Sequence, residues 1–221
     1  MGAGISLEEF ERQIREFEEY YEVAERAYLR AVEVCRQVDP STVDEFFARR
    51  YILVFLATWG QMWWVFRGYR NKVNPSELAR AIREVASEVS LLRELDLLEV
   101  DLENKEVARA VKRVFGKLME VKGIGSTGAS KIGHLLCPNL LVMWDVEIAN
   151  CYKISTNPEG YLQFLKRTQE LAREIVEQKA RKLGYSTREA TEALSREHEN
   201  RTLAKLIDEY NWWKIYKTFI F

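Results

Sequence analysis

The residues best suited to chemistry lie in one segment, residues 121–148. Two glycines, Gly123 and Gly125, stand close together there, and a lone aspartate, Asp145, follows 20 residues after the second. Glycines at this spacing allow a tight turn with positive φ, and the free N–H groups at the start of the next helix can bind a phosphate. A carboxylate can stabilise developing positive charge or activate a water molecule. The segment therefore predicts an anion-binding turn followed by a reactive carboxylate.

The turn is predicted to join two helices. One covers residues 105–121, and Ser126 is expected to cap a second from about Thr127 to Leu136, which Pro138 ends. Residues 105–131 carry seven Lys and Arg against two Glu, a local net charge of +5 that favours an anionic ligand or is simply a solvated helix face. The candidate phosphate-binding residues are Lys122, Gly123, Gly125, Ser126, Thr127, Gly128 and Lys131.

These residues resemble a known pattern. KGIGSTGASKIG is similar to the helix-hairpin-helix element of DNA-binding proteins, and WDVEI resembles the aspartate segment that follows it in the HhH-GPD superfamily. That superfamily holds the endonuclease III, adenine, alkyladenine and 8-oxoguanine DNA glycosylases. Its aspartate comes about twenty residues after the second hairpin glycine, with an apolar residue three positions later, and Asp145 and Ile148 match both positions.

The resemblance implies a base-excision DNA glycosylase that acts on double-stranded DNA. Such an enzyme flips a damaged or mismatched base into a pocket and hydrolyses its N-glycosidic bond. Asp145 matches the catalytic carboxylate. Bifunctional members carry a lysine two positions after the second hairpin glycine, where this chain has Thr127. That departure favours a monofunctional hydrolase, although Lys131, one helical turn further on, is a substitute amine.

The resemblance also bears on cofactors. Family hairpins often hold a monovalent cation through backbone carbonyls, and the matching positions are Val121 and Ile124. The chain has three cysteines, too few for an ordinary iron–sulfur cluster, and the cysteines and two histidines show no zinc-like spacing. We therefore expect no cofactor beyond that cation.

A flipped base would need an aromatic pocket. The candidates are Trp59, Trp63, Trp144 and His134, because flipped bases stack on aromatic side chains. The tryptophans occur at helical spacing that is also typical of a core, and His134 lies on an amphipathic helix that suits a surface or core role. Trp212 and Trp213 near the C-terminal end are candidates for stacking on nucleic acid, docking on the core or a dimer contact.

Apolar residues recur at three- and four-residue spacing over most of the chain, so the sequence predicts an all-α helical bundle with a central helix-hairpin-helix at about residues 107–136. We expect a single unit, with a division into two lobes (about 40–120, and 1–39 plus 121–221) as in the resembling family. The further helices expected cover residues 7–39, 43–66, 75–90, 146–153, 158–184 and 187 onward.

The composition of the chain excludes few classes of function. The net charge is −1, so total charge predicts no polyanion partner. The odd cysteine count and the lack of a signal peptide favour a cytoplasmic protein, which would be nucleoid-associated if it binds DNA. Residues 51–66 are apolar but shorter than the roughly 20 residues that a membrane span needs, so we expect a buried helix and no membrane partner.

Other interpretations of Asp145 and the glycine turn stay open. Asp145 is also a favoured helix cap, and the glycine turn could be a tight connection that binds nothing. Two rival functions follow: a non-catalytic helix-hairpin-helix module that binds nucleic acid, and a helical scaffold with no nucleic acid role. The sequence leaves the base, the oligomeric state and the protein partners undetermined.

Overall fold

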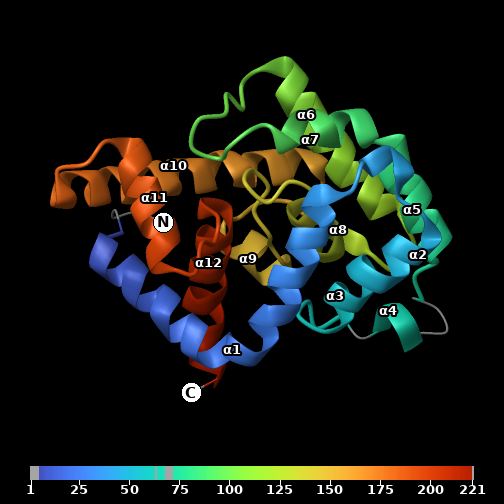
Figure 1. The fold of residues 1–221 in the computed structure, drawn as a ribbon, viewed down its shortest axis with the longest axis horizontal. Helices are drawn as coiled ribbons and strands as arrows, with labels where there is room; N and C mark the ends of the chain where they lie inside the picture. Colours follow the sequence, from blue (N-terminus) through green and yellow to red (C-terminus); the bar gives the residue numbers. More distant parts are fainter. Residues whose placement is uncertain (1–4, 63, 68–71, 221) are drawn as a thin grey trace.

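The computed structural model describes residues 5–62, 64–67 and 72–220 (Figure 1). Within these residues every regular element is helical, which confirms the all-α class. The elements are α1 (Leu7–Gln37), η1 (Pro40–Thr42), α2 (Glu45–Phe47), the π-helical η2 (Ala48–Leu53), α3 (Val54–Ala57), α4 (Trp64–Arg67), α5 (Pro75–Glu84), α6 (Ala86–Arg93), α7 (Lys105–Glu120), α8 (Gly125–Leu136), α9 (Val146–Cys151), α10 (Pro158–Leu183), α11 (Thr187–Glu197) and α12 (Leu203–Ile220).

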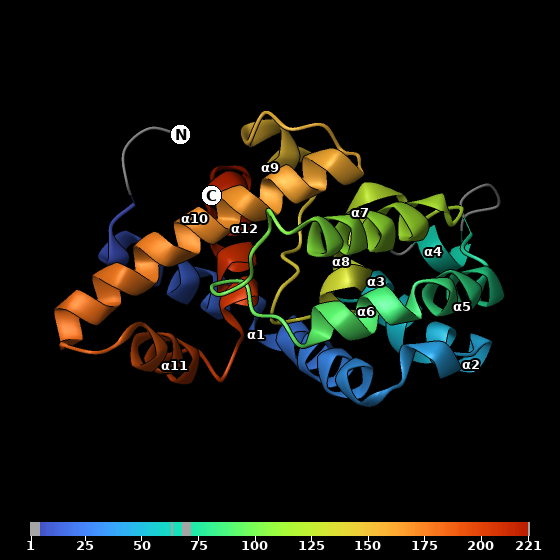
Figure 2. The ribbon, with the colours of Figure 1, turned by 90° about the horizontal axis from the view of Figure 1, so that it is seen from above.

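Two groups of helices meet around α8 and α12. Figures 1 and 2 show α10, α11 and α12 on one side and α2 to α7 on the other, with α1 extending from the first group to the second. α1 packs against α12 and α8, while α7 packs against α8, α6 and α10. The contacts of α7 with α8 and α10 cross the lobe boundary near residue 120, and the two-lobe division stays a prediction.

Local signals place several helix ends. The hydroxyl of Ser6 accepts the N–H of Glu9 at the start of α1, and Ser186 with Glu189 forms a full capping box at the start of α11. Gly184 ends α10 with φ of +69°, the left-handed conformation that favours glycine. These ends agree with the sequence prediction.

The expected helix 43–66 is not continuous. It passes through the π-helical η2, ends at Ala57, and α4 begins only at Trp64. Gly60 lies in the turn between them, where a Cβ atom would stand 2.6 Å from the carbonyl oxygen of Leu56, and Gln61 has φ of +54°. An apolar run shows burial but does not reveal a break, so this prediction was wrong. The expected helix 75–90 is likewise divided, at Val85, into α5 and α6.

The turn between α7 and α8 has the predicted conformation. Gly123 and Gly125 adopt φ of +88° and +61°. α8, however, begins at Gly125 rather than Thr127, and no side chain caps it, so the expected cap by Ser126 was wrong. The backbone carbonyl of Ser126 instead accepts the indole N–H of Trp144. Cβ atoms at Gly128 and Gly133 would meet Met62 and Ile124, and Leu141, respectively, so both glycines allow close packing around α8.

No helix within the described residues is long and apolar enough to cross a membrane.

Candidate functional site

A cavity of about 310 Å³ lies between five helices and the segment that follows α3. Both Asp145 and Lys131 line it. Its volume is near the lower end of the range for small-molecule sites. The remaining lining residues are mostly aromatic or apolar: Phe17, Tyr21, Trp59, Gly60, Gln61, Met62, Trp64, Thr127, Met143, Trp144, Ile148, Asp208, Trp212 and Tyr216.

Asp145 is the cap of α9 and also part of the cavity wall. Its Oδ1 accepts the N–H of Ile148 at 2.8 Å, and its Oδ2 accepts the hydroxyl of Tyr216 at 2.9 Å. The side chain is partly buried. The structure confirms the cap, while the catalytic role stays a prediction. Capping uses one oxygen and leaves the carboxylate at the edge of the cavity.

Lys131 lies on α8 and reaches into the same cavity rather than lying beside the exposed turn. Its Nζ donates to the carbonyl oxygen of Gly60 at 2.8 Å. Burial lowers the pKa of Lys131 below its ordinary value, while the charges of Asp208 and Asp145 act in the opposite direction. A partly buried amine with a lowered pKa, in the same cavity as a carboxylate, is suited to general acid–base or nucleophilic chemistry.

The break after α3 supplies the partner of Lys131. Because Gly60 has no Cβ, the backbone can fold close to Leu56, and the carbonyl of Gly60 then points toward α8. Gln61, in the same turn, donates from its side chain to the hydroxyl of Tyr21 at 2.7 Å. The residues that interrupt the expected helix therefore form one wall of the cavity.

Aromatic side chains form much of the remaining wall. Trp59 stacks on Phe55 and donates its indole N–H to Glu25, and the Nζ of Lys131 lies 5.6 Å from its ring centre. Trp212 and Tyr216 stack on each other with ring centres 4.8 Å apart. Flat aromatic faces in a cavity of this size suit a planar ligand such as a nucleobase.

Asp208 places a second carboxylate in the cavity wall. Its side chain is 7 % exposed, and one of its oxygens lies 3.6 Å from the Nζ of Lys205. Burial raises the pKa of Asp208 to about 7, although the ammonium of Lys205 opposes the shift. The cavity therefore holds two carboxylates in different environments, a hydrogen-bonded one at Asp145 and a buried one at Asp208.

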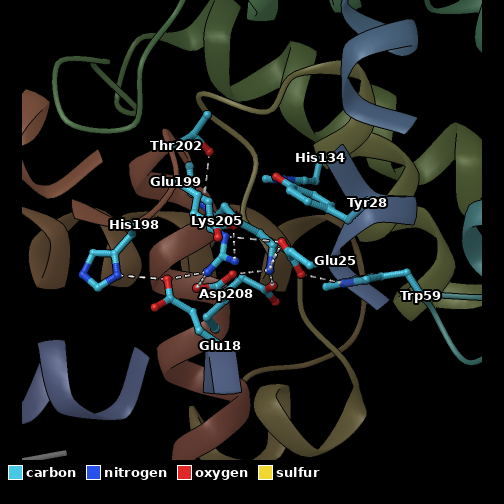
Figure 3. A network of polar contacts seen from close by, with 12 residues as sticks. Glu18, Glu25, Tyr28, Trp59, His134, His198, Glu199, Thr202, Lys205 and Asp208 are labelled. Atoms are coloured by element: carbon cyan, nitrogen blue, oxygen red, sulfur yellow. Dashed lines mark hydrogen bonds and ion pairs between the residues drawn. The ribbon is translucent and has the colours of Figure 1, made fainter. Parts of the chain in front are cut away.

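A buried ionic network lies behind the cavity (Figure 3). Lys205, on α12, contacts Glu209 at 2.7 Å, and its Nζ lies within 5.0 Å of the ring centres of Phe17, Tyr28 and Trp59. Arg201 contacts Glu209 at 3.3 Å and also reaches acids on α1. Figure 3 shows Lys205 beside Asp208, and Trp59 linked to the network through Glu25. It fixes α12 against α1 and so supports two walls of the cavity.

The turn between α7 and α8 lies at the surface. Lys122 and Gly125 are exposed, and the N–H groups of the first turn of α8 have no side-chain cap. Three of the basic residues on α7 are in ion pairs: Lys112 with Glu159, Arg113 with Glu88, and Lys117 with Glu84. The acids offset part of the local positive charge, so the anion-binding prediction rests mainly on the turn and Lys122.

The structure brings together only part of the predicted pocket. Trp59 and Trp144 line the cavity, although Trp144 is buried against Phe115 and Tyr161. His134 does not line it, and Trp63 lies outside the described residues. At the proposed cation site the carbonyl of Val121 accepts the N–H of Ile124 at 3.1 Å, and the cation stays a prediction.

His134 has a structural role in the core. Its Nδ1 lies 2.6 Å from the carbonyl oxygen of Leu141, so this nitrogen carries the proton, and Nε2 accepts the hydroxyl of Tyr28 at 2.8 Å. Burial lowers the pKa of His134 to about 3. The imidazole is therefore neutral at ordinary pH.

Sequence reasoning missed Asp208 and Tyr216 of α12, and named Trp212 only as a candidate for stacking on nucleic acid, docking on the core or a dimer contact. Asp208, Trp212 and Tyr216 recur at four-residue spacing and so share one face of that helix. A carboxylate in line with two aromatic residues on a largely buried helix was the available signal. Trp213, in contrast, packs on α1 and donates to Glu16 at 2.6 Å.

We compared the chain with protein-family models, curated proteins and solved structures, and none of them matches it.

Proposed function

We propose that the protein is a base-excision DNA glycosylase that binds duplex DNA through the α7–α8 turn and accepts a flipped damaged or mismatched base in the cavity. The observation that carries this proposal is the shared location of Asp145 and Lys131 in one aromatic-walled cavity. The resemblance of residues 121–148 to the helix-hairpin-helix and aspartate segments of such enzymes supports it independently.

In this proposal Asp145 is the catalytic carboxylate. Breaking the bond between the base and C1′ leaves positive charge on the sugar, and an anionic side chain nearby lowers the energy of that state. Water then adds to C1′ and gives up a proton, for which the carboxylate is the acceptor. The departing base takes a proton as it leaves, so the net reaction is hydrolysis.

The position of Lys131 favours a second candidate chemistry. Its Nζ, once neutral, can attack C1′ as the base leaves, forming a C1′–N bond that becomes an imine when the sugar ring opens. A proton lost from C2′ then allows the 3′ phosphate to leave, which cuts the strand. The lowered pKa of Lys131 suits this role, because only the neutral amine is a nucleophile.

The test is a panel of duplexes, each with one damaged or mismatched base. Release of the base is scored as strand breakage after alkali. We expect the wild type to release at least one base and Asp145→Asn to reduce the rate at least about a hundredfold. Asp44→Asn is the matched control, because Asp44 caps α2 in the same way, through the N–H of Phe47, and does not line the cavity. Asparagine caps helices about as well as aspartate, so both variants should fold.

The same panel separates the two chemistries. Strand breakage without alkali, and a covalent protein–DNA adduct after borohydride reduction, indicate imine formation. Both should then disappear in Lys131→Gln but persist in Lys166→Gln, which changes a partly buried lysine that pairs with Glu103 and does not line the cavity. Hydrolysis alone gives neither signal.

Negative results distinguish the rival functions. Salt-dependent duplex binding without release of any base supports a non-catalytic nucleic-acid-binding module. Absence of binding contradicts any nucleic acid role and leaves a helical scaffold.

A further inference from the structure

Tyr216 makes a contact with Asp145 that helix capping does not require. Capping needs one acceptor, and the bond from the N–H of Ile148 to Oδ1 supplies it. The second bond, from the Tyr216 hydroxyl to Oδ2, comes from α12, 71 residues away in sequence. The carboxylate cannot rotate without breaking both bonds, so its orientation is fixed from two sides.

The ring of Tyr216 is itself held in place. It stacks on Trp212 with an interplanar angle of 28°, and both rings line the cavity. Burial raises the pKa of Tyr216 above its ordinary value, and the negative charge of Asp145 raises it further. Tyr216 is therefore a protonated donor throughout the range in which the protein would work.

A hydroxyl donor beside a carboxylate has a definite chemical effect. It binds one oxygen of the carboxylate through a hydrogen bond and so restricts the orientation of the whole group. A tyrosine is also rigid, with few rotatable bonds, so it sets the direction in which the remaining lone pairs of the carboxylate point into the cavity.

We propose that Tyr216 is a positioning residue that orients the Asp145 carboxylate, so that the face of α12 completes the reactive site. This inference rests on the proposed glycosylase function and adds a residue from an element that the resemblance does not cover. Trp212 contributes by holding the tyrosine ring.

The experiment compares wild type, Tyr216→Phe and Tyr210→Phe under single-turnover conditions, on whichever duplex the wild type processes. Tyr210 lies on the same helix, and its hydroxyl accepts from Lys214, away from Asp145. We expect Tyr216→Phe to lower the rate of base release about tenfold or more, since a charge-assisted hydrogen bond is lost. The dissociation constant for DNA should stay within about twofold, so that the loss falls on the rate of base release alone. Tyr210→Phe should match the wild type in both.

The outcomes are distinct. A wild type that releases base alongside an equally fast Tyr216→Phe overturns the positioning role and leaves the glycosylase function intact. A slower Tyr216→Phe whose DNA binding weakens to a similar extent shows a structural role and also overturns it. A wild type that releases no base overturns the function and this inference together. Should Tyr216→Phe fail to fold, Tyr216→His, which keeps an aromatic ring and an N–H donor, is compared with Tyr216→Leu and should be the faster of the two.

Discussion

Asp208, in the cavity wall, makes the free energy of unfolding depend on pH. Its pKa is about 7 in the folded protein, because of burial, and the ordinary value applies when the chain unfolds. Between about pH 4 and pH 7 the folded state therefore holds a proton that the unfolded state has released. The stability that protonated Asp208 contributes is fully present below about pH 4 and is lost as the pH rises from about 4 to about 7.

We predict that Asp208→Asn removes this dependence. The wild type should lose stability relative to the variant as the pH rises from about 5 to about 7, by at most ~1.4 kcal/mol per pH unit, and the gap should then stay constant up to about pH 9. Urea unfolding across that range measures it. A gap that does not change with pH would contradict the prediction.

His134 acts in the opposite direction and cancels in this comparison. Its folded pKa of about 3 lies below the ordinary value, so its contribution is complete above about pH 6.5 and is lost as the pH falls toward 3. Because His134 is the same in wild type and Asp208→Asn, the difference between the two proteins isolates Asp208.

At the scale of elements, the turn between α7 and α8 depends on backbone conformation rather than on space. A Cβ at Gly125 would meet nothing within 4 Å, yet φ is +61°, which L-residues rarely adopt. Gly184 has nearly the same conformation, with φ of +69°, and is equally open. Gly184 is therefore a control for Gly125, because both have positive φ and open surroundings but only Gly125 lies in the α7–α8 turn.

We predict that Gly125→Ala and Gly184→Ala each lower the free energy of unfolding by about 1 kcal/mol. Only Gly125→Ala should also weaken duplex binding, because it alone alters the proposed phosphate-binding turn. Urea unfolding and a DNA titration at fixed salt measure the two effects. Equal binding by both variants would exclude the turn from the DNA interface.

Elements with local signals were predictable from the sequence, and the site was predictable only in part. The Ser6 and Ser186 caps, the end at Gly184 and the glycine turn depend on a few neighbouring residues, so pattern alone locates them. The break at Gly60 depends on how the chain meets α8, and the contact between Tyr216 and Asp145 depends on how α12 docks. Short spacings do not show such long-range packing, so the sequence predicted Lys131 both as a phosphate-binding residue of the turn and as a substitute amine, and only the structure places it in the cavity.

At the scale of the whole molecule, the buried network joins the first and last long helices. Arg201 is 3 % exposed and faces Glu25 and Glu209, which are also buried. Removing one member of such a network leaves an uncompensated charge in the interior, which costs far more than loss of a surface pair. The docking of α12 on α1 therefore depends strongly on this arginine.

We predict that Arg201→Met lowers the free energy of unfolding by about 3–5 kcal/mol. The control is Arg188→Met, whose arginine is 89 % exposed and pairs with Glu192, and which should change stability by less than about 0.5 kcal/mol. Thermal and urea unfolding measure both. A small effect at Arg201 would show that the acids are neutralised by other means.

The docking of α12 against α1 has a consequence for any molecule that enters the cavity. Its walls come from segments as far apart as Phe17 and Tyr216, so a partly folded chain has no cavity to offer. A ligand there binds the native state alone, so it must raise the melting temperature of the entire chain, and the rise follows the logarithm of its concentration once that concentration exceeds the dissociation constant. Thermal shift against free bases and abasic-site analogues would therefore report occupancy of the cavity before any reaction is known.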